Sequence, residues 1–399
     1  MESAYIVDIV RTPIGKFGGT LASVRPDDLA AHVIKALMAR NSAFDPKLLE
    51  DVVFGAANQA GEDNRNVARM AALMAGLPLE VGGITVNRLC ASGLQSIMDA
   101  SRGLMVGDGE AFIAGGTESM TRAPFVQGKS EMAFSRATNM FDTTIGWRFP
   151  NPKLSALHYP YAMGETAENV SERWKVSREA QDEFAHQSQQ KYQAAHEAGR
   201  FSEEIVPVDV PQRRADAIHF DKDEHPRLST LEKLSTLKPA FKEGGTVTAG
   251  NSSGINDGAA ACLVVNERIL KELNLEPMAR VKSMAIAGVS PEVMGVGPIP
   301  ATQKALKRAG LTTNDLDLIE LNEAFAAQAI PCMRELELDP EKVNVNGGSI
   351  AIGHPLGASG TRISATLLHE MQKREGTKYG LATMCVGVGQ GAAIIFEKC

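Results

Sequence analysis

The chain of 399 residues has few cysteines, no surplus of basic side chains and no long apolar run. Its five cysteines are odd in number, widely spaced and contain no CxxC pair. This pattern argues against a disulfide framework or a bound metal and favours a reducing compartment. The net charge of −7 argues against nucleic acid or an anionic membrane as the main partner. No apolar run is long enough to span a membrane.

The start of the chain lacks the features of a targeting segment. Residues 1–10 resemble a strand and contain no basic region followed by an apolar one. We therefore expect no signal or transit peptide, and a cytoplasmic protein.

What the chain does contain is the composition of a soluble globular protein, with 44% hydrophobic and 22% charged residues. Its length predicts two or three domains. Strands predicted at residues 5–10 and 51–55 alternate with helices predicted at 26–40 and 66–75. This alternation predicts an α/β fold with a partly parallel sheet.

A single cysteine lies where one predicted strand gives way to a helix. Residues 84–89 have strand character, and apolar residues recur at helical spacing over residues 94–104. Backbone N–H groups and the helix dipole near Cys90 would favour a thiolate. The arrangement is that of a nucleophile elbow with sulfur in place of oxygen. A buried structural cysteine is the alternative.

The second half of the sequence repeats the first at a constant offset of 267 residues. The matching segments are 44–52 with 311–319, 91–93 with 358–360, and 111–115 with 378–382. One register across three elements predicts two copies of one α/β unit. We assign residues 1–120 with 246–270 to the N-terminal half and residues 271–399 to the C-terminal half.

The region between the halves differs from both in its composition and in its pattern of apolar residues. In residues 121–245 apolar periodicity weakens, and both tryptophans fall here. Helices are predicted at 164–174 and 177–199, and a loop or hairpin at 213–228. We interpret the region as an inserted loop domain that covers the site or forms oligomer contacts.

The repeat brings four reactive or polar side chains together. The offset places Gly357 opposite Cys90, and His354 lies three residues before Gly357. Strand ends and the loops after them face one rim of an α/β sheet. Four residues should lie near this rim: Cys90, Asn322, His354 and Cys385.

Each of these residues has an ordinary structural explanation when taken alone. His354 could be a core histidine, Cys385 a small core residue and Asn322 a turn or cap residue. The Gly-rich residues 387–391 follow no complete dinucleotide-binding fingerprint. Together, a Cys–His pair suits acyl transfer, a second cysteine suits proton transfer at carbon, and both steps need oxyanion donors. The set predicts chemistry on a C–C bond next to a thioester.

At these positions the sequence resembles the thiolase family over essentially its whole length. The motifs are residues 87–93 (NRLCASG), 250–254 (GNSSG), 322–325 (NEAF), 353–355 (GHP) and 385–391 (CVGVGQG). The resemblance implies duplicated βαβαβαββ halves in a five-layered α-β-α-β-α thiolase fold. It also implies coenzyme A and acetyl-CoA as substrates, no permanently bound cofactor, and a homotetramer built as a dimer of dimers.

The resemblance also implies a role for each site residue. Cys90 would be the acylated nucleophile, His354 the base that activates it, and Cys385 the acid/base for acetyl-CoA's methyl group. His354 with a water on Asn322 would form one oxyanion hole, and the N–H groups of Cys90 and Gly387 the other. The implied substrate and CoA contacts are Ser253, Ala249, Gly250, Phe325 and Met163, with Arg227 a looser match to a nucleotide contact.

The implied reaction is CoA-dependent thiolytic cleavage of a 3-ketoacyl-CoA to acetyl-CoA and a shortened acyl-CoA. We expect a degradative enzyme of β-oxidation and fatty acid metabolism. An acetoacetyl-CoA-forming thiolase is an alternative, although Ala162 replaces the His that its members share. Residues 58–69 and 140–149 resemble the 3-oxoadipyl-CoA branch, with Arg136 and Arg148 as candidate contacts to a second carboxylate. Both arginines could instead be surface or inter-subunit contacts.

Two rivals come from other functional classes. A decarboxylating condensing enzyme shares the duplicated fold but does not need Cys385 as a base at carbon. A non-catalytic CoA- or lipid-binding protein would not need Cys90, His354 and Cys385 together.

Overall fold

The computed structural model describes residues 2–399, so Met1 of the expected first strand lies outside the described residues. The first half follows the order β-α-β-α-β-α-β-β. Its elements are β1 (Ala4–Arg11), α1 (Pro26–Arg40), β3 (Leu49–Gly55), α2 (Val67–Ala75), β4 (Ile84–Val86), α3 (Ser92–Val106), β5 (Ala111–Ser119) and β10 (Asn256–Asn266).

The second half repeats this order with its third strand reduced to one bridge, between Ile319 and Val343. Its elements are β11 (Ala279–Gly288), α9 (Pro298–Ala309), β12 (Leu318–Leu321), α10 (Ala326–Glu335), α11 (Ser349–Ile352), α12 (Leu356–Lys373), β13 (Tyr379–Val386) and β14 (Gln390–Lys398). The 3₁₀ turns Pro46–Leu48 and Thr313–Asp315 lie 267 residues apart, as the repeat predicts.

The strands of the two halves join at one edge. The order is β12-β13-β14-β11-β1-β10-β5-β3-β4, with the short strand β2 (Gly15–Lys16) beside β10. The parallel pairs are β3 with β4 and β5 in the first half and β12 with β13 in the second. In each half an antiparallel pair follows, β5 with β10 or β13 with β14. Only Tyr5 with Arg280 and Ile6 with Ala279 pair across the junction of β1 and β11. Within residues 2–399, the strands of the two halves are therefore connected by only these two residue pairs.

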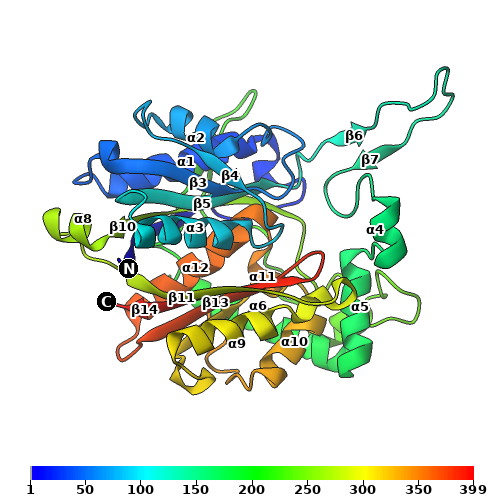
Figure 1. Ribbon diagram of the computed structural model, residues 1–399. Helices are drawn as coiled ribbons and strands as arrows, with labels where there is room; N and C mark the ends of the chain where they lie inside the picture. The colour runs from blue at the N-terminus through cyan, green and yellow to red at the C-terminus, as the bar shows by residue number, and fades with distance from the viewer. Residues whose placement is uncertain (1) are drawn as a thin grey trace.

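The layers follow from this arrangement (Figure 1). Helices α1 and α2 cover the outer face of the first sheet, α9 and α10 cover that of the second, and α3 and α12 lie between the sheets. Every residue of β5 and β10 is buried, as expected for strands covered on both faces. The predicted five-layered α-β-α-β-α fold is confirmed.

The two central helices approach closely because glycines face the contact. A Cβ added at Gly360 of α12 would lie 2.1 Å from the backbone nitrogen of Leu94 in α3. A Cβ at Gly93 would lie 2.7 Å from the carbonyl oxygen of Gly357. The N-terminal ends of both helices therefore meet between the sheets, where the two predicted elbows lie.

Helix α1 shows how local sequence sets an element's ends. Pro26 occupies its first turn, where a missing N–H costs no hydrogen bond. Asp27 and Asp28 follow in that turn and Arg40 stands in the last turn, so their charges oppose those of the helix dipole. The predicted limits of residues 26–40 are confirmed.

The chain between β5 and β10 extends away from the layered core and then returns to it. Strands β6 and β7 form a hairpin that projects away from the layers (Figure 1). Predicted residues 213–228 contribute β9, which pairs with β8. The elements are β6 (Phe125–Gln127), β7 (Met140–Asp142), α4 (Pro152–Leu157), α5 (Met163–Trp174), α6 (Arg178–Glu197), β8 (Val208–Val210), β9 (Ile218–Phe220) and α7 (Leu231–Ser235). Across residues 2–399, no helix combines the length and apolarity that a membrane crossing needs.

Candidate active site

Cys90 lies in a strained turn between β4 and α3. Leu89, just before it, has a φ of 47°, a left-handed conformation that costs energy for a branched side chain. Ser92 holds the turn, because its hydroxyl donates to the carbonyl oxygen of Leu89 (2.7 Å) and accepts from the N–H of Arg88 (2.9 Å). The N–H of Leu89 also donates to Oδ1 of Asn87 (2.9 Å). The predicted elbow therefore exists.

The environment of Cys90 disfavours the thiolate overall. Burial raises the pKa of the Cys90 thiol to about 11, although N–H groups, including that of Gly387, act in the opposite direction. The negative charge of Glu118 raises the pKa further. The backbone N–H groups favour the thiolate, as expected, but desolvation outweighs them. Cys90 needs a base to become a nucleophile.

His354 has one ring nitrogen engaged and one free. Its Nδ1 lies 2.6 Å from the Ser359 hydroxyl, which itself donates to the carbonyl oxygen of Pro355 (2.8 Å). The single hydroxyl hydrogen is thus used, so Nδ1–H of His354 must be the donor to Ser359. Nε2 then carries a lone pair, and it is buried without a hydrogen-bond partner among residues 2–399.

The protonation state of His354 suits a base. Burial, and to a smaller extent the positive charge of Arg362, lower the pKa of His354 to about 3. The imidazole is therefore neutral near pH 7, with Nε2 ready to accept a proton. The backbone N–H of His354 donates to Oδ1 of Asn256 (2.9 Å), which fixes the residue in its turn.

A buried chain of hydrogen bonds fixes the orientation of the Asn322 side-chain amide. Arg362, which can only donate, gives a hydrogen bond to the Ser349 hydroxyl (2.6 Å). Ser349 in turn donates to Oδ1 of Asn322 (2.6 Å). Nδ2 of Asn322 is left buried with no partner in the described chain. The site therefore contains an amide donor that is oriented but unused.

Cys385 is the second thiol of the site and lies at the end of β13. It is 1% exposed, and burial raises the pKa of its thiol well above the usual value, with Cys90 raising it further. Cys385 packs in one cluster with Phe325 and Met163. A Cβ added at Gly387 would lie 3.7 Å from the sulfur of Met163. Cys90, Cys385, Gly387, Phe325 and Met163 thus gather in one place.

The predicted CoA contacts form a second group beside the first. The N–H of Ser253 donates to the carbonyl oxygen of Ala324 (3.0 Å), which precedes Phe325. Arg227 donates from its guanidinium to the carbonyl oxygen of Ala249 (2.5 Å). The Ser253 bond joins the loop that carries the predicted CoA contacts to the residues around Cys385, and the Arg227 bond holds the start of this loop.

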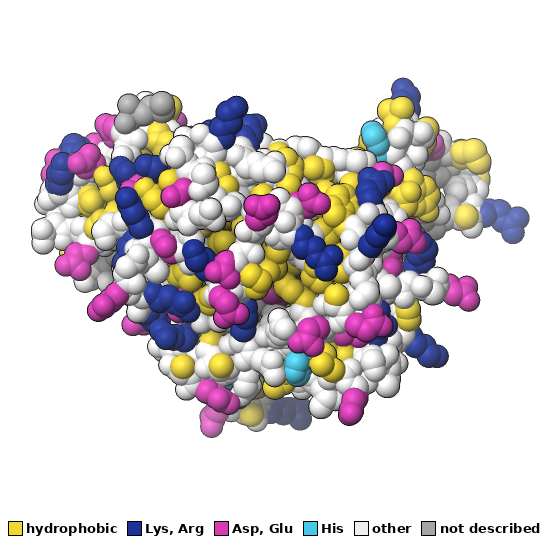
Figure 2. Space-filling model, turned by 90° about the horizontal axis from the view of Figure 1, so that it is seen from below, with side chains coloured by type: hydrophobic (Ala, Val, Ile, Leu, Met, Phe, Trp, Pro, Cys, Tyr) yellow, Lys and Arg dark blue, Asp and Glu magenta, His cyan; other side chains and the backbone are white. Residues whose placement is uncertain are grey.

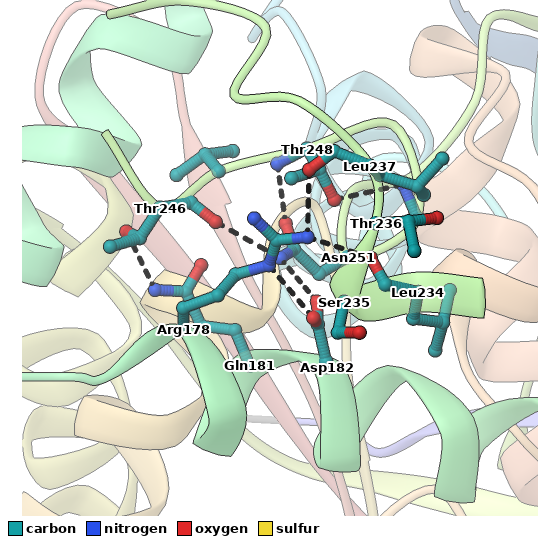
Figure 3. A network of polar contacts seen from close by, with 12 residues as sticks. Arg178, Gln181, Asp182, Leu234, Ser235, Thr236, Leu237, Thr246, Thr248 and Asn251 are labelled. Atoms are coloured by element: carbon teal, nitrogen blue, oxygen red, sulfur yellow. Dashed lines mark hydrogen bonds and ion pairs between the residues drawn. The ribbon is translucent and has the colours of Figure 1, made fainter. Parts of the chain in front are cut away.

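Side chains of helix α6 form hydrogen bonds with the same loop and with the residues next to it (Figure 3). Arg178 bonds Asp182 (2.7 Å) and the carbonyl oxygen of Leu234 (2.7 Å). Asp182 also accepts from the side-chain amide of Asn251 (2.9 Å), the neighbour of Gly250. The network gives the predicted CoA loop a fixed shape.

Comparison with known proteins agrees with this geometry. Residues 4–268 match the family model of the thiolase N-terminal domain, and residues 275–398 match that of the thiolase C-terminal domain. The chain belongs to the thiolase family. It is therefore an enzyme of the acetyl-CoA acyltransferase class, and the predicted family is confirmed.

Individual thiolases align along the whole chain. The 3-oxoadipyl-CoA/3-oxo-5,6-dehydrosuberyl-CoA thiolase of Escherichia coli (strain K12) is 54% identical, with 100% of both chains covered. The structure of Bacillus anthracis acetyl-CoA acetyltransferase has a TM-score of 0.94 at 41% identity, covering 100% of this chain and 99% of that one. Human mitochondrial 3-ketoacyl-CoA thiolase in complex with CoA has a TM-score of 0.92 at 40% identity, covering 100% and 98%.

The thiolase site also contains a carboxylate to which sequence reasoning gave no role. Glu118, at the end of β5, accepts from the N–H groups of Ala57 (2.9 Å), Asn58 (3.1 Å) and Gly357 (2.7 Å). It thereby ties the first half to the turn that follows His354. Burial raises the pKa of Glu118 to about 7. The sequence did contain a signal for Glu118, because the internal repeat aligns this residue with Cys385.

Three further residues of this thiolase were not predicted: Ser349, Ser359 and Arg362. Their side chains bond His354 or Asn322, directly or through one another. Ser359 follows the GHP motif by four residues and could have been found as a helix-turn partner of it. Ser349 and Arg362 carry no such signal, since they meet Asn322 only in the folded chain.

Proposed function

We propose that this thiolase cleaves 3-oxoadipyl-CoA, or a closely similar dicarboxylic 3-ketoacyl-CoA, by transfer to coenzyme A. The products from 3-oxoadipyl-CoA are acetyl-CoA and succinyl-CoA. The observation that carries the reaction is the free Nε2 lone pair of neutral His354. The thiols of Cys90 and Cys385 support it, because they are near enough for the charge of Cys90 to raise the pKa of Cys385. The substrate rests on the Escherichia coli relative named for 3-oxoadipyl-CoA. This replaces fatty acid β-oxidation as the favoured process.

The geometry supports a role for each group. His354 Nε2 takes the proton of Cys90, whose sulfur attacks the 3-keto carbonyl carbon. The C2–C3 bond then breaks, and Cys385 gives a proton to the departing acetyl-CoA enolate. A second CoA thiol attacks the acyl-Cys90 thioester and leaves with the acyl group. Nδ2 of Asn322, which we propose acts through a bound water, is one oxyanion donor, and the N–H groups of Cys90 and Gly387 are the others.

Coenzyme A is a substrate of this enzyme class, and the reaction needs no resident cofactor. For the CoA contacts we propose Ser253, Ala249, Gly250, Phe325 and Met163, with Arg227 near the nucleotide end. The fixed 249–253 loop supports this assignment. We place the enzyme in the cytoplasm.

We propose that the inserted region, residues 121–245, covers the site and joins subunits of a homotetramer. Phe134, on the projecting β6–β7 hairpin, is 99% exposed. Other large apolar side chains of this arm are also exposed: Phe125, Met132 and Met140. Hydrophobic side chains also gather in the middle of the face seen in Figure 2, surrounded by charged ones. Exposed apolar surface of this extent is typical of interfaces.

A rate series tests the substrate. Thiolysis is measured for acetoacetyl-, 3-oxohexanoyl-, 3-oxooctanoyl- and 3-oxoadipyl-CoA, and kcat/KM should be highest for 3-oxoadipyl-CoA. Mass spectrometry after incubation with 3-oxoadipyl-CoA should show a succinyl adduct on Cys90, absent in Cys90→Ser. A higher kcat/KM for acetoacetyl-CoA would instead assign the enzyme to acetyl-CoA acetyltransfer.

A further inference from the structure

A short segment of the inserted region lies against two loops that border the active site. The Nδ2 group of Asn58 donates to the hydroxyl of Thr143 (3.1 Å). Four residues later, Nε1 of Trp147 donates to the carbonyl oxygen of Tyr161 (3.1 Å). Residues 143–148 are therefore held between the loop after β3 and the start of α5.

Both of these loops reach the reacting groups. The carbonyl oxygen of Ala57, next to Asn58, accepts from Asn87 (2.9 Å), three residues before Cys90. On the other side, Tyr161 lies two residues before Met163, whose sulfur approaches Gly387. The segment is therefore linked by hydrogen bonds to the two loops that lead to Cys90 and to Met163.

Arg148 is the cation of this segment. Its NH2 group donates to Oδ1 of Asn58 (3.0 Å) and to the carbonyl oxygen of Asn58 (3.3 Å). Because Nδ2 of Asn58 is used by Thr143, Oδ1 is fixed toward Arg148. Within residues 2–399, Nε and NH1 of Arg148 make no hydrogen bond and no carboxylate forms an ion pair with Arg148.

An arginine with unused donors and no carboxylate partner favours binding of an anion. Arg148 is half-buried, and the Nε and NH1 donors of its guanidinium are left over on opposite edges of the group. Either donor can form one charge-assisted hydrogen bond with a carboxylate oxygen. The side chain is held in place by Asn58, so little rotamer entropy would be lost on binding.

We propose that Arg148 binds the terminal carboxylate of a dicarboxylic 3-ketoacyl-CoA, with Asn58 as its positioning residue. The inference rests on the proposed function and deepens it, since it assigns the substrate's second charge to one side chain. The acyl chain on Cys90 would extend past Leu89 and Met163 toward the start of α5. Ala162 at that point leaves more room than a larger side chain would.

The test is a ratio of specificities in matched variants. For wild type and Arg148→Gln, kcat/KM is measured with 3-oxoadipyl-CoA and with 3-oxohexanoyl-CoA, which has the same length and no second carboxylate. We expect the ratio of the two values to fall about tenfold or more in Arg148→Gln. Arg148→Lys, a milder change that keeps the charge, should retain part of the ratio.

Arg136→Gln is the matched control, because Arg136 is exposed on the projecting arm. It should keep the wild-type ratio. An unchanged ratio in Arg148→Gln, with wild type still preferring 3-oxoadipyl-CoA, overturns the role of Arg148 and leaves the proposed function standing. Equal losses on both substrates also overturn it, because they indicate a structural or inter-subunit contact. A wild type without preference for 3-oxoadipyl-CoA refutes the proposed substrate itself.

Discussion

The hydroxyl of Ser349 donates a 2.6 Å hydrogen bond to Oδ1 of Asn322. Arg362 fixes the direction of this bond, because its guanidinium donates to the same hydroxyl (2.6 Å). The amide of Asn322 therefore presents its NH2 group, and not its oxygen, to the site. An oxyanion or its bound water requires that orientation.

Ser349→Ala should lower kcat while leaving KM for CoA near its wild-type value. Without the hydroxyl, nothing holds Oδ1 of Asn322, and the amide can turn its oxygen toward developing negative charge. We expect a loss in kcat of about tenfold, roughly 1.4 kcal/mol of transition-state stabilisation. Steady-state kinetics of thiolysis measure it.

Two further variants separate positioning from a packing defect. Ser349→Thr keeps the hydroxyl and should recover most of the activity. In an Asn322→Ala background, Ser349→Ala should cause no additional loss, because the two residues act as one unit. An additive loss would mean that Ser349 acts independently of Asn322.

Cys385→Ala should abolish proton exchange at the methyl group of acetyl-CoA. The side chain is near enough to Cys90 for the charge of Cys90 to raise its pKa, and it is the proposed acid/base for carbon. We expect exchange measured by NMR in deuterium oxide to fall by about 10²–10⁴-fold. Acetylation of Cys90 by acetyl-CoA should persist, since it needs His354 but not Cys385.

Cys332→Ala provides the control for loss of a buried thiol near this site. Cys332 is also fully buried, and its thiol contacts only the carbonyl oxygen of Gly295 (3.4 Å) in the hydrogen-bond network. Its exchange rate should match wild type. Exchange that survives in Cys385→Ala would favour a decarboxylating type of condensing chemistry.

The stability of the enzyme should fall in acid, in part through His354. The folded-state pKa is lowered from 6.5 to about 3, so below pH 6.5 the unfolded chain binds a proton that the folded one excludes. Stability from this group is therefore complete above pH 6.5 and is lost as the pH falls toward 3, by about 1.4 kcal/mol per pH unit.

Urea unfolding between about pH 7.5 and 5 measures this contribution. His354→Gln should unfold with a smaller loss of stability over that interval, even if it is less stable at neutral pH. His225 is a histidine comparable to His354, because burial also lowers the pKa of His225 to about 3. An unchanged slope in His354→Gln would mean that the imidazole is not desolvated in the folded enzyme.

The sequence reveals the reacting residues because a duplication leaves a register. The offset that aligns the 3₁₀ turns Pro46–Leu48 and Thr313–Asp315 also relates the elbow of Cys90 to the turn of His354. The pKa of Cys90, in contrast, could not be predicted from the register of the repeat. Its pKa depends on how much protein covers the sulfur, and that cover comes from distant segments such as the one containing Gly387.

The residues that orient Asn322 likewise could not be predicted from the sequence. Ser349 and Arg362 lie 13 positions apart and act on Asn322 through contacts that exist only after the halves fold. Small or apolar residues flank Arg362 in α12, from Gly360 to Ser364, so the local pattern gives no reason for a buried cation. Such a residue is explained by its partners, and sequence spacing does not name them.

Gly360→Ala should destabilise the enzyme strongly by separating the two central helices. The added Cβ would lie 2.1 Å from the backbone nitrogen of Leu94 and 2.6 Å from its Cβ, and backbone cannot rotate aside. Overpacking in a close-packed interior typically costs about 1–3 kcal/mol, and this backbone contact should reach or exceed the upper value. Urea unfolding measures the change.

The matched control is Gly288→Ala at the end of β11, where the nearest atom to an added Cβ is 3.9 Å away. Its stability should stay within about 0.5 kcal/mol of wild type. Since α3 and α12 carry the turns of Cys90 and His354, Gly360→Ala should also lower kcat in whatever fraction folds. A Gly360→Ala enzyme with wild-type stability and kcat would show that the two elbows tolerate a wider spacing than this packing implies.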